Sequence, residues 1–189
     1  MATPKFAHIV LQTSRKPQMR DWYCNVLGAH VVFENEVLCF LTFDDEHHRI
    51  ALLSPPVQLD PRSPKAAGLN HSAFTFASLD ELLERYLALK EKGIEPAVPI
   101  QHGVTTSLYY RDPDGSFAEL QVDNFATPDE ATGYMRGPEY AADAVGVSFS
   151  PEKMISARAA GISDAVVKTR TWALETSPEL PNPIIVLTS

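Results

Sequence analysis

Two histidines and one glutamate have the types and positions to hold one divalent metal ion. His8 and His71 lie in the first strand-like segments of two similar stretches of the chain, and Glu119 lies in the last strand-like segment of the second stretch. Two imidazoles and one carboxylate on one face of an octahedron are a common ligand set for non-haem Fe(II), and they leave positions open for substrate and dioxygen. The sequence therefore predicts a metal site with His8, His71 and Glu119 as ligands.

Each of these residues, taken alone, has an ordinary explanation. A histidine in a strand is more often a hydrogen-bonded structural residue than a ligand, and Glu119 could face solvent on the polar side of its strand. The pattern as a whole favours a site, because an unpaired carboxylate among apolar neighbours is costly to bury and a metal ion removes that cost. Leu52 stands in the first stretch where Glu119 stands in the second, which leaves one carboxylate in the set.

The elements that must position these residues follow one order twice, a strand, a helix and three strands. In the first stretch the strands are expected at 5–13, 29–35, 37–44 and 47–54, and the helix at 17–28. In the second stretch the strands are expected at 70–77, 95–101, 105–112 and 116–123, and the helix at 79–93. Ser78 and Glu81 form a capping box at the start of the second helix, and each helix ends at a glycine, Gly28 or Gly93.

This order predicts an α+β fold built from two paired βαβββ modules, 5–54 and 69–124, which form an open, incomplete β-barrel-like sheet around the metal site. Residues 55–68 contain four prolines and form a linker, so residues 1–127 make one catalytic domain. Residues 128–189 do not continue the repeat. We expect an irregular C-terminal tail there, with one short helix after Pro151, which packs on the core, on a neighbouring subunit or over the mouth of the site.

Composition narrows the class of protein. The 189 residues carry a net charge of −8 and are 44% hydrophobic, which is typical of a globular domain and argues against nucleic acid or an anionic membrane surface as a partner. No apolar run reaches the roughly 18 residues that span a bilayer. The N-terminal residues alternate as in a strand and do not resemble a secretory signal. Cys24 and Cys39 are interpreted as free thiols in a reducing compartment, so we expect a cytoplasmic protein.

The repeat, the histidine near the start of each unit and the Asp112-Pro113-Asp114-Gly115 turn before Glu119 resemble the vicinal oxygen chelate superfamily over residues 5–124. This superfamily includes glyoxalase I, bleomycin- and fosfomycin-resistance proteins, methylmalonyl-CoA epimerase and the type I extradiol catechol dioxygenases. Three further residues resemble the dioxygenases. His48, in His-His-Arg-Ile-Ala, matches their active-site histidine, His102 begins a similar His-Gly-x-Thr segment, and Tyr109 matches their active-site tyrosine.

The resemblance implies a one-domain, Fe(II)-dependent extradiol dioxygenase, with Mn(II) as the other metal, that uses O2 for meta cleavage of a catechol-type or 2,3-dihydroxybiphenyl-like diol. His48 would help deprotonate the diol or stabilise bound oxygen. His102 would hydrogen-bond an oxygen and donate a proton, and Tyr109 would hold the deprotonated substrate oxygen. It also implies a homo-oligomer. Four apolar side chains and the tail are expected to surround the aromatic ring, namely Phe40, Phe74, Leu108 and Tyr110.

Other interpretations remain open at this point. His47 and His48 could form an exposed polar turn, His102 could be an ordinary loop residue, and Tyr109 could be core. A glyoxalase-like lyase or isomerase of the same fold would need a second carboxylate where Leu52 stands. A metal-free resistance protein that binds a drug would need none of the three ligands.

Overall fold

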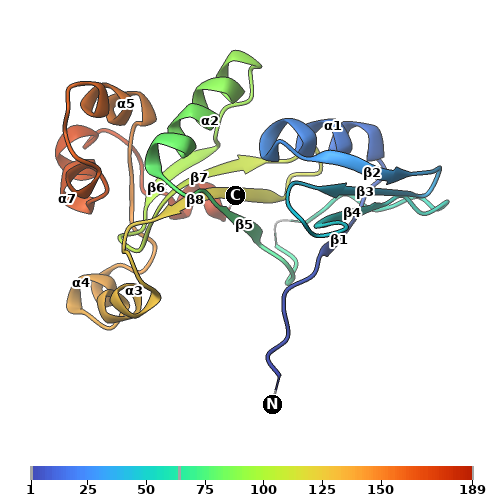
Figure 1. The fold of residues 1–189 in the computed structure, drawn as a ribbon, viewed down its shortest axis with the longest axis horizontal. Coiled ribbons are helices and arrows are strands. Elements are labelled where there is room, and N and C mark those ends of the chain that lie inside the picture. Colours follow the sequence, from blue (N-terminus) through green and yellow to red (C-terminus); the bar gives the residue numbers. More distant parts are fainter. Residues whose placement is uncertain (1, 64, 189) are drawn as a thin grey trace. The chain divides into compact units, whose positions relative to one another are not determined.

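The computed structural model describes residues 2–63 and 65–188, and the chain divides into two compact units. The first unit is Met1–Ala66 together with the turn Asp112–Ser116. The second unit is Ala67–Arg111 with Phe117–Ser189. Each unit has its own open sheet, as Figure 1 shows, so the predicted mixed α+β class with unclosed sheets is confirmed.

The first unit is a four-stranded sheet covered on one face by a helix. Its strand order is β1-β4-β3-β2, with β1 parallel to β4 and the other neighbours antiparallel. The strands are β1 (Ile9–Gln12), β2 (His30–Glu34), β3 (Leu38–Thr42) and β4 (Ile50–Leu53). Helix α1 (Lys16–Leu27) buries Met19, Tyr23 and Val26, contacts β3 and β4, and ends at Gly28, whose left-handed φ of 68° suits glycine.

The Asp-Pro-Asp-Gly turn is fastened to this helix. The buried carboxylate of Asp112 accepts the hydroxyl hydrogen of Tyr23 at 3.1 Å and the backbone N–H groups of Asp114 and Ser116. Burial raises the pKa of Asp112, and these three donors favour its ionised form. Gly115 takes a φ of 85°, which only glycine adopts without strain. The motif therefore has a structural role in the first unit.

The second unit is a five-stranded sheet with the order β5-β8-β7-β6-β9, in which β5 and β8 are parallel and the others antiparallel. The strands are β5 (His71–Thr75), β6 (Val98–Gln101), β7 (Thr105–Arg111), β8 (Phe117–Asp123) and β9 (Val147–Ser148). Helix α2 (Leu79–Glu91) begins as predicted, because the Ser78 hydroxyl accepts the Glu81 N–H and the Glu81 carboxylate accepts the Ala77 N–H. Its apolar stripe is buried, and it contacts β8.

Strand pleating decides which side chains share a face with the candidate ligands. Tyr109 is paired with Glu119, and successive strand residues point to opposite faces. Leu108 and Tyr110 therefore lie on the face covered by α2, and both are fully buried there. Phe74 pairs with Leu120 and belongs to that face too. The prediction that these three line the substrate pocket was wrong. We call the opposite face, which carries His71, Tyr109 and Glu119, the site face.

The residues after 127 are more ordered than the irregular tail expected from the sequence. The described residues of this segment, 128–188, form β9, which pairs with β6, and six helices, α3 (Pro128–Met135), α4 (Pro138–Ala142), α5 (Pro151–Ala159), α6 (Asp164–Val167), α7 (Arg170–Thr176) and α8 (Ile184–Leu187). The helix expected after Pro151 is confirmed. The prolines at 128, 138 and 151 misled the prediction, because they occupy first turns, where a helix needs no N–H.

This C-terminal extension, residues 128–189, packs on the second module of its own chain. The guanidinium of Arg158 donates two hydrogen bonds of 3.0 Å to the carboxylate of Asp80, and Glu152 accepts from Tyr86 and Lys90. All three partners belong to α2. In Figure 1 the extension runs from yellow to red beside the sheet of the second unit.

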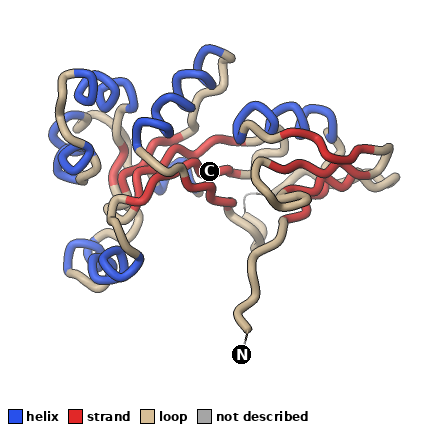
Figure 2. The backbone as a smooth tube through the Cα atoms, viewed as in Figure 1, coloured by secondary structure: helices blue, strands red, loops and turns tan. Residues whose placement is uncertain are grey.

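Two candidate residues lie just outside the strands expected to carry them. Strand β1 starts at Ile9, one residue after His8, and His48 lies in the loop between β3 and β4. Residues 55–63, the first part of the expected linker, are loop, which Figure 2 draws in tan. Among the helices of the described residues, none is both long and apolar enough to cross a membrane.

Candidate metal and catalytic site

His71 and Glu119 face each other on the site face. The Nε2 atom of His71 lies 3.1 Å from Oε2 of Glu119, and the glutamate side chain is 5% exposed. The other ring nitrogen of His71, Nδ1, lies 2.9 Å from the amide oxygen of Asn70. That oxygen accepts the Nδ1 hydrogen, so a neutral His71 turns its Nε2 lone pair toward a carboxylate. The lone pair and the carboxylate repel each other. Either a proton on Nε2 or a cation between the two groups removes this repulsion.

The donor set fits a metal ion. Two donor atoms bound at about 2.1 Å and at a right angle lie about 3.0 Å apart, close to the observed separation of Nε2 and Oε2. A metal-bound histidine usually donates its other ring N–H to an oxygen, as His71 does to Asn70. Burial raises the pKa of Glu119, but hydrogen bonds from His71 and Ser107 outweigh it, so this pKa lies below its ordinary value. Glu119 is thus an anion at neutral pH, as a carboxylate ligand has to be.

A second pair, His102 and Tyr109, adjoins Glu119. The hydroxyl of the buried Tyr109 lies 3.0 Å from Nε2 of His102, and Nε2 lies 3.9 Å from Oε1 of Glu119. Burial lowers the pKa of His102, and burial followed by the charge of Glu119 raises the pKa of Tyr109. At neutral pH the imidazole is therefore neutral and the phenol keeps its proton. Three groups able to accept, hold or release protons meet here.

The first unit brings together the other two candidates. The rings of His8 and His48 lie 4.3 Å apart between centroids, and Phe40 stacks on His48 at 4.5 Å with an interplanar angle of 10°. His48 is buried, whereas the side chain of His47 is 71% exposed, so the polar-turn interpretation holds for His47 alone. Burial, followed by the neighbouring His8 and His47, lowers the pKa of His48.

The structure thus places the six predicted residues in two groups. Those of the second unit are His71, His102, Tyr109 and Glu119, and those of the first unit are His8 and His48. Within residues 2–63 and 65–188, no three or more His, Cys, Asp or Glu side chains are grouped as a metal site. Since His8 belongs to the other unit, its joining of His71 and Glu119 stays a prediction.

Four residues that contact the candidates were missed by sequence reasoning. They are Asn70, Ser107, Val145 and Arg170. Ser107 could have been found, because it alternates with Tyr109 on one strand and therefore shares its face. Asn70 simply precedes His71. No local pattern marks Val145 and Arg170, which reach His102 from the C-terminal extension.

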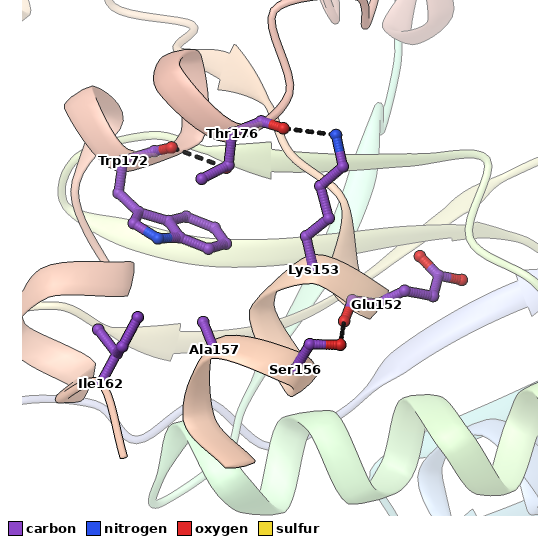
Figure 3. Close-up of a pocket in the computed structure, with 7 residues that line it drawn as sticks. All are labelled: Glu152, Lys153, Ser156, Ala157, Ile162, Trp172 and Thr176. Atoms are coloured by element: carbon purple, nitrogen blue, oxygen red, sulfur yellow. Dashed lines mark hydrogen bonds between the residues drawn. The ribbon is translucent and has the colours of Figure 1, made fainter. Parts of the chain in front are cut away.

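The extension also contains a pocket of about 480 Å³ that none of the predicted site residues lines. Figure 3 shows the Trp172 ring on one side of it and Ala157 and Ile162 on the other. The ammonium of Lys153 at its rim already donates to the main-chain oxygen of Thr176 and to a glutamate. This pocket therefore adds no group to the chemistry of the site.

Comparison with known proteins identifies the class. The model of the Glyoxalase/Bleomycin resistance protein/Dioxygenase superfamily matches residues 5–120, and the chain belongs to this superfamily. The resemblance drawn from the sequence is confirmed.

Two relatives from Rhodococcus globerulus are similar along nearly the whole chain. Biphenyl-2,3-diol 1,2-dioxygenase 2 is 65% identical over 188 residues, which cover 100% of this chain and 99% of that protein. Biphenyl-2,3-diol 1,2-dioxygenase 3 is 58% identical over 175 residues, which cover 92% of each. The crystal structure of a glyoxylase/bleomycin resistance protein/dioxygenase domain from Frankia sp. EAN1pec shares the fold, with a TM-score of 0.55 and 17% identity over 67% of this chain and 96% of that one.

Proposed function

We propose that this chain is an extradiol ring-cleaving dioxygenase whose substrate is a catechol-type diol, with biphenyl-2,3-diol as the first candidate. The two Rhodococcus relatives are named for this reaction, and they confirm the predicted class of enzyme. The observation that carries the proposal is the buried Glu119 carboxylate, which meets His71 on one side and the His102–Tyr109 pair on the other.

Extradiol dioxygenases of this superfamily are metal-dependent. We propose Fe(II), with Mn(II) as the alternative, held by His8, His71 and Glu119. When bound, the ion would hold the two hydroxyls of the diol next to dioxygen and pass electron density from the ring to oxygen. Both atoms of O2 enter the ring-opened product, so the reaction needs no external reductant.

The residues of the chain would handle the protons. A diol must lose hydroxyl protons when it binds as an anion, and a proton must return when the ring opens. The neutral His102 has a lone pair at Nε2 that can accept a proton and later release it. The Tyr109 hydroxyl lies near two acceptors, His102 Nε2 and the Glu119 carboxylate, and it can donate its hydrogen in more than one direction. It could therefore donate to a substrate oxygen bound beside Glu119. Burial of the phenol keeps that proton on Tyr109.

In the first unit we propose that His48 is a second base. Its lowered pKa keeps the imidazole neutral near pH 7, which a base requires. Phe40 stacks flat against the ring and fixes its plane. The apolar surface of Phe40 and Phe33, whose ring centroids are 5.6 Å apart, would suit an aromatic substrate.

We further propose a cytoplasmic homo-oligomer that binds neither nucleic acid nor membranes, with residues 1–127 as the catalytic domain and 128–189 as its extension. Cys24 and Cys39 are free thiols, which suits a reducing compartment. Edge strand β2 exposes Val31 and Val32, which supports self-association. Light scattering of the purified protein tests the oligomer, and a monomeric mass would contradict it.

The residue of β4 equivalent to Glu119 argues against the glyoxalase-like alternative. Val10, two residues after His8, pairs with Ala51 just as Ala73, two residues after His71, pairs with Glu119. The expected equivalence with Leu52 was therefore off by one residue, but alanine supplies no second carboxylate either. The proposed function is tested by loading the protein with Fe(II) without oxygen and then adding oxygen and a panel of catechols that includes biphenyl-2,3-diol. We expect oxygen uptake and a yellow ring-opened product. A protein that binds the diol without iron and consumes no oxygen would instead be a binding module.

A further inference from the structure

The C-terminal extension reaches the ring of His102. The Nδ1 atom of His102 is hydrogen-bonded to the main-chain oxygen of Val145, which lies just before β9. A carbonyl oxygen can only accept, so Nδ1 carries the hydrogen. The other ring nitrogen, Nε2, is left to accept a proton, and it faces the Tyr109 hydroxyl at 3.0 Å. The extension thus selects the tautomer in which His102 can act as a base toward Tyr109.

A buried arginine holds the main chain on both sides of this contact. Arg170, the first residue of α7, is 7% exposed. Its guanidinium donates to the main-chain oxygen of His102 and, at 2.8 Å, to that of Asp143. It also lies over the rings of Tyr134 and Tyr140, at 5.9 Å and 5.7 Å from their centroids. One cation therefore links the loop that carries His102 to the loop that carries Val145.

The loop of Val145 is itself fixed. The carboxylate of Asp143 accepts the N–H groups of Val145 and Gly146, each at 2.9 Å. A side chain at Gly146 would place its Cβ 2.3 Å from the main-chain oxygen of Gln101, and one at Gly103 would place its Cβ 2.2 Å from the Tyr134 hydroxyl. Two glycines thus allow the extension to approach the residues on either side of His102.

The extension has a distinct distribution among the similar proteins. The match to the superfamily model ends at residue 120 of this chain. The Frankia domain is matched over 96% of its own length but covers only 67% of this chain. The relative named biphenyl-2,3-diol 1,2-dioxygenase 2 matches over 100% of the chain, extension included. The extension is therefore an addition to the common fold, and this chain shares it with a protein named for ring cleavage.

We infer that Arg170 is a positioning residue for proton transfer, and that the extension completes the active site by fixing the orientation and tautomer of His102 through Arg170 and the Val145 carbonyl. The inference rests on the proposed function, which makes His102 the group that moves the proton. Partners that orient a catalytic or metal-bound histidine commonly contribute about 10–100-fold to activity. Loss of Arg170 should therefore lower kcat by about that factor while KM and iron content change little.

The test compares two pairs of variants with one control. Arg170→Met removes both donors and keeps the length of the side chain, whereas Arg170→Lys keeps a cation and should restore part of kcat. Asp143→Ala releases the loop of Val145, whereas Asp143→Asn keeps an oxygen acceptor at the same place. Arg158→Met breaks the contact of α5 with Asp80 on α2 and should keep wild-type turnover.

Kinetics with biphenyl-2,3-diol, iron analysis and circular dichroism are measured for each variant. Heteronuclear NMR of the ring nitrogens of His102 is recorded on the full-length protein with Zn(II) in place of iron. We expect the hydrogen of His102 on Nδ1 in wild type and Arg158→Met, and its loss from Nδ1 in Arg170→Met and Asp143→Ala.

The inference is overturned if Arg170→Met keeps the wild-type kcat, if Arg158→Met loses as much as Arg170→Met, or if wild-type His102 carries its hydrogen on Nε2. Where Arg170→Met fails to fold, the two Asp143 variants and the wild-type tautomer decide. Failure of the proposed function looks different. Wild-type protein would then cleave no diol, whatever the tautomer of His102.

Discussion

Replacement of Glu119 by glutamine is the sharpest perturbation of the proposed metal site. Glutamine has nearly the same shape and keeps one oxygen that can accept from Ser107, but it removes the negative charge that faces His71. The side chain is almost inaccessible, so water cannot easily replace the lost ligand. Loss of a residue that merely supports a ligand costs about 10–100-fold in metal affinity, so loss of the carboxylate itself should cost at least about 100-fold.

This change in affinity translates into a measurable stability. An ion present at about 100 times its Kd stabilises the folded state by about 2.7 kcal/mol, and a 100-fold weaker site leaves about 0.4 kcal/mol. For a chain of this size, those values correspond to an iron-induced rise in Tm of about 5–10 °C in the wild type and about 1–2 °C in Glu119→Gln. The metal-free Tm should change little, because the lost charged hydrogen bonds are offset by relief from burying a carboxylate.

The assay is thermal unfolding without oxygen, with and without Fe(II), together with metal analysis. Glu84→Gln makes the same charge change at an exposed position on α2 and serves as the matched control, with an expected wild-type response to iron. If Glu119→Gln binds iron as tightly as the control does, the reasoning that makes Glu119 a ligand is refuted.

Three further outcomes are expected. Tyr109→Phe removes the hydroxyl that faces His102 and should lower kcat by about 10–100-fold with iron retained, whereas an unchanged kcat would exclude Tyr109 from proton transfer. His48→Ala should likewise keep its iron and lose most turnover, and wild-type rates would remove His48 from the mechanism. Although burial raises the pKa of Glu152, hydrogen bonds from Lys90 and Tyr86 lower it to about 2. Because this pKa is depressed, the ionised Glu152 stabilises the folded state. That stabilisation should be complete above about pH 4.5 and lost as the pH falls toward 2. In urea unfolding at pH 7, Glu152→Gln should therefore have a lower free energy of unfolding than the wild type, by less than about 1 kcal/mol because the pair is so exposed. This difference should shrink at pH 3, and a difference that does not depend on pH would contradict the reasoning.

Much of the fold could be predicted because the chain repeats its pattern. The alternation around Glu119 identified its strand, and the capping residues Ser78 and Glu81 located the second helix, since such signals act within a few residues. Alternation also implied that Tyr109 and Tyr110 face opposite sides. It did not say which side carries the ligands, and Tyr110 was therefore placed in the pocket although it packs under α2.

The parts of the fold and of the site that were not predicted depend on contacts between residues far apart in sequence. Strand β9 is two residues long and forms only because β6 offers an edge with which to pair. The partners of His102 are 43 and 68 residues away, at Val145 and Arg170. No local periodicity encodes such contacts, so the sequence identified His102 and gave no sign of what holds it.

Identification of the product is the most direct test of the proposed dioxygenase activity. Protein loaded with Fe(II) is mixed with biphenyl-2,3-diol and oxygen, without added reductant, and the product is analysed by mass spectrometry and NMR while oxygen uptake is recorded. Extradiol cleavage predicts one O2 consumed per diol and a product whose mass is that of the diol plus one dioxygen, with the ring opened beside the two hydroxyls. An intact ring, or a product without both oxygen atoms, would contradict it.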